Sequence, residues 1–111
     1  MKNIELILIQ KIIQHASEAI EFVHGISYEQ FVESRKDINA VTHSILQMGE
    51  LSKKIELETR LAYHNIPWKE MSGTRDRIVH DYDGINLRLI WDIIQNDLPN
   101  LITNLQKIIQ N

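Results

Sequence analysis

The residues best suited to chemistry lie close together between positions 75 and 82. This short stretch holds two arginines, a histidine, two aspartates and a tyrosine: Arg75, Asp76, Arg77, His80, Asp81 and Tyr82. A histidine titrates near neutral pH, so it can take the proton of a ribose 2′-hydroxyl or give one to the leaving oxygen. An arginine is permanently charged and can hold a phosphate through two N–H groups. Arg75 and His80 are therefore candidates for cleaving a phosphodiester without a metal.

The spacing of this pair limits how one chain can use it. On an α-helix, Arg75 and His80 point about 140° apart around the axis, because they are five residues apart. Three arrangements remain open: Arg75 bends round, the helix ends near His80, or a second copy of the chain supplies the other half of the site. Asp83-Gly84 predicts a turn just after the helix. Tyr82 lies within about 20° of the Arg75 face, seven residues on.

The same residues also have a purely structural interpretation. Asp76 and His80 are i,i+4 neighbours, and so are Arg77 and Asp81. Such pairs stabilise an exposed helix by only a few tenths of a kcal/mol and need no function. A tyrosine at a helix end can simply pack its ring against the core. Spacing alone therefore leaves both catalysis and an ordinary helix surface open.

Apolar spacing predicts helices through nearly the whole chain. The first covers residues 4–23 and carries two neighbouring apolar stripes before Gly25 ends it. We expect this wide arc either to sit centrally in a bundle or to be covered in part by another chain. Ser27 and Gln30 form a predicted capping box for a short helix over residues 28–34.

The other expected helices cover about residues 35–61, 68–80 and 86–111, and Pro67 lies in the break before the second of these. Pro99 lies inside the last one, which predicts a kink or a break there. The fold class is therefore all-α: an up-and-down four-helix bundle with an extra short helix, in one domain over residues 1–111.

Composition excludes several classes of protein. The 111 residues include no cysteine and only four glycines and two prolines, against 43% apolar residues. A disulfide framework and a thiolate nucleophile are therefore excluded, and a strand-and-turn protein is disfavoured. The net charge of −3 argues against binding nucleic acid through bulk electrostatics. Residues 51–90, however, hold seven basic and six acidic residues, so the acidity lies outside the motif region.

The chain carries no pattern typical of a membrane or cofactor protein. The apolar start, residues 4–13, is interrupted by Glu5, Gln10 and Lys11, which favours a helix over a signal peptide. No run approaches the ~18 apolar residues of a membrane span, so we expect a cytoplasmic protein. Histidine spacing fits no metal motif, and a glycine-rich phosphate loop is missing. We therefore expect neither a metal nor a cofactor.

One dipeptide within the predicted long helix stands out. Gly49-Glu50 places a glycine where it costs about 1 kcal/mol relative to alanine. Either two helices pack closely at Gly49, or Glu50 faces a cleft between two copies and supports the site there.

The motifs along the chain together resemble one known family. Arg75-Asp76-x3-His80-x-Tyr82 matches the Arg-polar-x3-His pattern of HEPN domains and, more closely, the Arg-x4-His-x-Tyr motif of HepT-like toxins. The surroundings agree over essentially the whole chain, in residues 45–51, 66–73, 81–86, 90–91 and 96–99.

The resemblance implies a HEPN-like fold, an activity and a set of partners. HepT-like proteins are all-helical homodimers whose Arg and His motifs meet in a cleft and cleave RNA without a metal. A minimal nucleotidyltransferase antitoxin, MntA-like, transfers AMP from ATP to the motif tyrosine and silences the toxin. Carried over, Arg75 and His80 are catalytic and Tyr82 is the AMPylated residue. Asp76 takes a polar position that is often Asn in relatives. A carboxylate there is unfavourable near phosphate, unless it orients His80 or is paired with Arg77.

Two functions from different classes follow. The first is a metal-independent ribonuclease toxin of a HepT/MntA-type (type VII) toxin–antitoxin system. The second is a non-catalytic helical dimerisation or binding partner of a minimal nucleotidyltransferase. The complete set of Arg75, His80 and Tyr82 favours the first, whereas Asp76 and the net charge of −3 favour the second.

Overall fold

The computed structural model describes residues 1–110, except for the side chain of Tyr82. Every regular element in this part of the chain is a helix or a helical turn. The predicted all-α, HEPN-like bundle is thereby confirmed for this part, while Asn111, the expected end of the last helix, lies outside it. None of the described helices has an apolar run long enough to cross a lipid bilayer. In chain order the elements are α1 (Asn3–Phe22), α2 (Tyr28–Glu33), α3 (Arg35–Lys53), α4 (Leu57–Ala62), α5 (Trp68–His80), the 3-10 turn η1 (Tyr82–Gly84), α6 (Leu87–Asp92), the π-helical turn η2 (Ile93–Asp97) and α7 (Leu98–Gln110).

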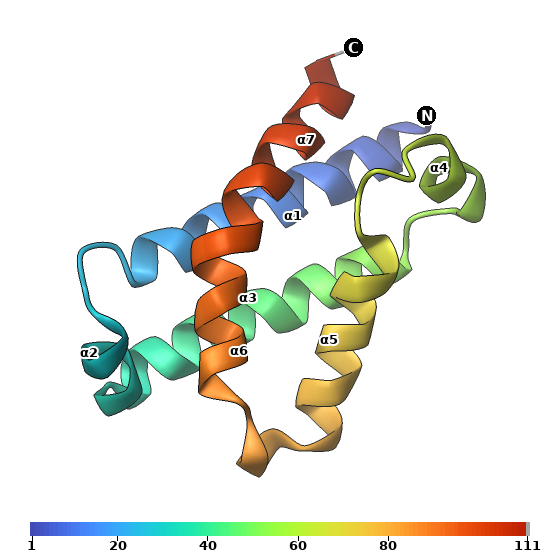
Figure 1. Cartoon of the computed structure of the whole chain (residues 1–111). Helices are drawn as coiled ribbons and strands as arrows, with labels where there is room; N and C mark the ends of the chain where they lie inside the picture. Colours follow the sequence, from blue (N-terminus) through green and yellow to red (C-terminus); the bar gives the residue numbers. More distant parts are fainter. Residues whose placement is uncertain (111) are drawn as a thin grey trace.

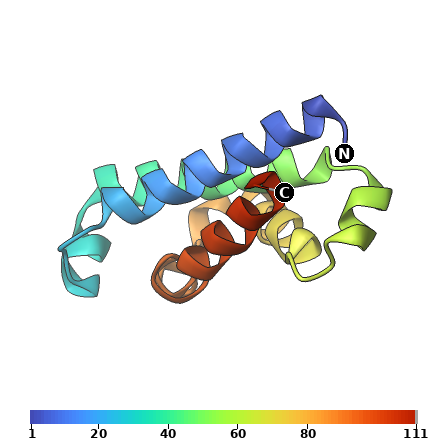
Figure 2. The same cartoon turned by 90° about the horizontal axis from the view of Figure 1, so that it is seen from above.

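The main helices form two layers (Figures 1 and 2). Helices α1 and α3 lie side by side in one layer, and α5 and the rod made by α6, η2 and α7 form the other. Helix α3 packs against both α1 and α5, while α1 also packs against α7. The core between the layers includes the fully buried side chains of Ile9, Ile12, Val41 and Leu105. Helix α3 therefore fixes where α5, the helix that carries the motif, can lie.

The wide apolar arc of α1 is covered mostly by the chain itself. Leu8, Ile12 and Ala19 of its second stripe are buried in the core. Only the ends of that stripe, Ile4 and Phe22, are exposed. The chain itself therefore covers most of this arc, while the second expected alternative, cover by another chain, stays a prediction.

The predicted helix over residues 35–61 is wrong in one respect, because the chain leaves the helix after Lys53 and starts α4 at Leu57. The buried carboxylate of Glu5 on α1 meets the chain where α4 begins. Its Oε2 accepts the backbone N–H of Glu56 at 2.8 Å, and its Oε1 accepts the hydroxyl of Thr59 at 2.7 Å. A distant carboxylate thus satisfies the start of α4. The bundle consequently has two extra short helices, α2 and α4, rather than one.

Replacing Glu5 by Gln is expected to lower the free energy of unfolding at neutral pH by about 1–3 kcal/mol. Burial alone would raise the pKa of Glu5, but the hydrogen bonds from Thr59 and the Glu56 N–H outweigh it, and the net shift is downward. A lowered pKa in the folded state stabilises the fold above the ordinary glutamate pKa, and this contribution is lost as the pH falls through the folded value. Urea unfolding at several pH values measures the difference, with Glu21→Gln, on the exposed face of α1, as control. A Glu5→Gln effect that does not shrink in acid would contradict this account.

The other predicted helix ends are largely confirmed. Gly25 follows α1 with a φ of 81°, a conformation that suits glycine, and Ser27 and Gln30 form both bonds of the capping box. At Pro99 the expected kink or break is instead a π-helical turn within a continuous rod (Figure 1), in which the Leu98 N–H bonds the Ile93 carbonyl. Proline has no N–H, and its ring crowds the carbonyl four residues back, so the helix widens for one turn.

Candidate active site

Helix α5 carries the motif and is anchored firmly at its start. Trp68 is buried and donates its Nε1–H to the Tyr63 carbonyl at 3.1 Å. Further along, Thr74 and Ile78 are buried against the rest of the bundle. The helix ends at His80, as predicted, and stays helical through Arg75 and His80. These two residues therefore point about 140° apart around the axis, as the spacing requires.

The crossing of α3 and α5 at Gly49 is unusually close. A Cβ placed on Gly49 would lie 2.2 Å from the Cβ of Arg75 and 2.9 Å from the backbone carbonyl oxygen of Met71. No larger residue fits there without moving one of the helices. Close packing is thus the reason for the glycine, and the atoms that need the space belong to the motif arginine and to the backbone of Met71.

Glu50, the residue after Gly49, forms an ion pair with Arg75. Glu50 places its Oε1 2.8 Å from Nε of Arg75. The Nη1 of Arg75 in turn donates to Oδ1 of Asp76 at 3.1 Å. The Arg75 side chain is 27% exposed, so it is half-buried between α3 and solvent with two carboxylates beside it. Of the two explanations of Gly49-Glu50, close packing applies, because Gly49 admits Arg75. That Glu50 faces a cleft between two copies stays a prediction; within one chain it pairs with the guanidinium of Arg75.

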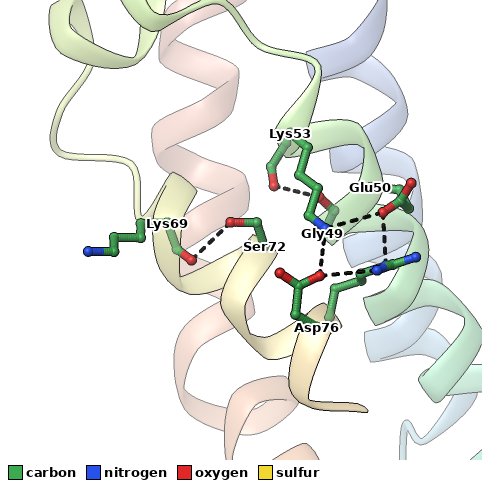
Figure 3. Close-up of polar contacts among 8 residues, drawn as sticks. Gly49, Glu50, Lys53, Lys69, Ser72 and Asp76 are labelled. Carbon is green, nitrogen blue, oxygen red and sulfur yellow. Dashed lines mark hydrogen bonds and ion pairs between the residues drawn. The ribbon is translucent and has the colours of Figure 1, made fainter. Parts of the chain in front are cut away.

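Lys53 is a fourth member of this cluster, and the sequence pattern did not single it out. Figure 3 shows its side chain reaching from α3 to Asp76 on α5, where its ammonium donates to Oδ1, and it lies 3.7 Å from Oε1 of Glu50. The ammonium of Lys53, and then the guanidinium of Arg75, lower the pKa of Asp76. Asp76 is thus engaged by Lys53 and Arg75, and neither His80 nor Arg77 is its partner among the described residues. The only signal in the sequence was the i,i+3 spacing of Glu50 and Lys53.

His80 lies on another side of α5. It is exposed and lines a groove of about 650 Å³ between the end of α5 and the start of α6, together with Asp76, Arg77 and Leu89. Arg75 does not line this groove. Within one chain the structure therefore brings Arg75 together with Glu50 and Asp76, and places His80 in a groove that shares only Asp76 with that cluster.

Two further predictions concern the modification of Tyr82 and the absence of a metal site. The backbone of Tyr82 begins the turn η1, one residue beyond the end of α5, but its side chain lies outside the described residues, so its modification stays a prediction. Across the described residues, no group of three or more His, Asp or Glu side chains is placed to hold a metal ion.

Comparison with known proteins places these residues in a wider context. The family described as "Ribonuclease HepT-like" matches residues 12–108. A protein of Caldanaerobacter subterraneus subsp. tengcongensis with the name "Putative RNase" is 36% identical over 102 residues, which is 92% of this chain and 91% of that protein. "Probable ribonuclease HepT" of Thermococcus cleftensis is 34% identical over 97 residues, or 86% of this chain and 88% of the relative. No solved structure gives a significant match.

Proposed function

This chain belongs to the HepT-like ribonuclease family, and on that premise we propose that it is a metal-independent RNA endonuclease with Arg75 and His80 as catalytic residues. The observation that carries the proposal is the environment of Arg75. Glu50 fixes its Nε at 2.8 Å, and the Nη edge meets only Asp76 among the described residues. That edge can bind two oxygens of a phosphate once Asp76 gives way.

The proposed step needs only these side chains and the RNA. The ribose 2′-oxygen attacks the neighbouring phosphorus, and the bond from phosphorus to the 5′-oxygen breaks. A proton leaves the 2′-hydroxyl and one reaches the 5′-oxygen, so the step is balanced and yields a 2′,3′-cyclic phosphate. His80 moves a proton at one of these oxygens. Arg75 stabilises the charge that develops on the phosphate.

We further propose that the active form is a homodimer in which Arg75 of one copy works with His80 of the other. Support comes from the separation of the two residues around α5 and from the exposed apolar side chains beside His80. Val79 is 50% exposed and Leu89 37%. Exposed apolar side chains that gather near a groove are typical of a contact with another protein.

The biological role that we propose is that of a toxin in a HepT/MntA-type (type VII) pair, acting in the cytoplasm. Induced expression of the wild type is expected to arrest bacterial growth, whereas Arg75→Ala and His80→Ala are expected to allow it. Equal arrest by all three proteins, or arrest by none, would contradict catalysis by these residues. It would instead favour a non-catalytic partner of a nucleotidyltransferase.

Neutralisation is proposed to occur at Tyr82 through a minimal nucleotidyltransferase. The phenol oxygen bonds to the α-phosphorus of ATP, pyrophosphate leaves, and the phenolic proton passes to solvent. After co-expression with a minimal nucleotidyltransferase of the MntA type, intact-mass and peptide spectra are expected to locate AMP on Tyr82. Tyr82→Phe is expected to stay unmodified and toxic, while the control Tyr63→Phe is modified like wild type. Full rescue by the antitoxin with an unmodified Tyr82 would contradict the proposal.

A further inference from the structure

We propose that Lys53 is a positioning residue of this site, which neutralises the Asp76 carboxylate so that Arg75 can turn its Nη edge from Asp76 to a phosphate. The inference rests on the proposed ribonuclease function and adds to it a residue from a different helix, outside the motif.

The position of Asp76 creates the need for such a residue. Around α5, Asp76 lies about 100° from Arg75 and about 40° from His80, on the arc between them. It also belongs both to the ionic cluster and to the groove that His80 lines. A phosphate approaching this helix therefore meets the carboxylate of Asp76, and an unpaired carboxylate would repel it.

Lys53 is placed to cancel that repulsion. Its ammonium and Nη1 of Arg75 both donate to the same oxygen, Oδ1 of Asp76. When Nη1 leaves for a phosphate, Lys53 still holds that oxygen, while Glu50 still holds Nε of Arg75. The four side chains carry two positive and two negative charges. Without Lys53 the cluster would have a net charge of −1 beside a phosphate.

The neighbouring lysine provides a matched control. Lys54 follows Lys53 directly, carries the same charge and is exposed. Among the described residues its side chain makes no ion pair with a carboxylate. An effect that depends only on the net charge of this surface would therefore appear equally in variants of both lysines.

A double-mutant cycle tests the proposal. RNA cleavage, as kcat/KM, is measured for Lys53→Met and Lys54→Met, each in the Asp76 and the Asp76→Asn background. Lys53→Met is expected to lower cleavage about tenfold when Asp76 is present, and by no more than about twofold when position 76 carries the neutral amide. Lys54→Met is expected to change cleavage by less than about twofold in both. Melting temperatures should agree closely throughout, because exposed ion pairs contribute little to stability.

Three other outcomes would contradict the proposed role of Lys53. Equal effects of the two lysine variants would overturn the role of Lys53 and leave the ribonuclease proposal intact. An equal loss for Lys53→Met in both backgrounds would also overturn it, because Lys53 would then act on the RNA directly and not through Asp76. A wild-type protein that cuts no RNA would overturn the proposed function and this inference with it.

Discussion

Purified His80→Ala is expected to cleave RNA about 10²–10⁴ times more slowly than the wild type, because it lacks the group that moves a proton in the proposed step. Arg75→Ala is expected to lose about 10²–10³. Arg75→Lys is expected to recover little, because an ammonium lacks the planar pair of N–H groups that fits a phosphate. Initial rates on a labelled RNA, with a chelator present, measure these effects. The control is His64→Ala, which alters an exposed histidine outside the motif helix.

The same two variants, which are expected to be inactive, also decide whether the site is shared between copies. Arg75→Ala and His80→Ala chains with different affinity tags are co-expressed, and the mixed dimer is purified through both tags. If Arg75 works with His80 of the other copy, one of the two sites in this dimer is intact. The mixed dimer is then expected to show about half of the wild-type activity per dimer.

The alternative gives a clearly different result. If one chain supplied both residues to its own site, each site of the mixed dimer would lack one of them. Activity would then stay at the level of the single variants. That outcome would contradict the shared site and would require Arg75 to swing about 140° around α5 towards His80. Such a movement would break its contact with Glu50.

Local features of the sequence were sufficient to predict most of the helices. The capping box at Ser27 and Gln30, and the end of α5 at His80, each depend on residues a few positions apart. Glu5 shows where this reasoning fails. Its carboxylate bonds the start of α4 from 51 residues away, and a contact of this range leaves no sign in the periodicity of residues 35–61.

The candidate site likewise has one part that the local sequence predicts and one part that depends on long-range contacts. Arg75, His80 and Asp76 lie within six residues and could be recognised as a group from the sequence. Lys53 could not, because its contact with Asp76 spans 23 residues and depends on how closely α3 and α5 cross. The residue that sets this distance, Gly49, was visible as an oddity within a helix. The sequence left open which atoms needed its space, and these belong to Arg75 and Met71.

Replacing Gly49 by Ala is therefore expected to damage both stability and activity. The new Cβ would lie 2.2 Å from Arg75 Cβ and 2.9 Å from the Met71 carbonyl, which is backbone and cannot rotate away. Forcing the helices apart is expected to lower the free energy of unfolding by about 1–3 kcal/mol. This loss appears even though alanine favours a helix over glycine by up to about 1 kcal/mol. RNA cleavage is expected to fall at least about tenfold, because small displacements of a catalytic group are costly.

Gly73 in α5 provides a control that distinguishes steric crowding at Gly49 from the effect of helix propensity. It also lies inside a helix, but a Cβ there would meet nothing within 4 Å. Gly73→Ala is therefore expected to raise the free energy of unfolding by up to about 1 kcal/mol, the opposite sign to Gly49→Ala. Denaturant unfolding of both variants measures the difference. Stabilisation by both alanines would mean that α3 and α5 can separate without cost, and Gly49 would then not determine the position of Arg75.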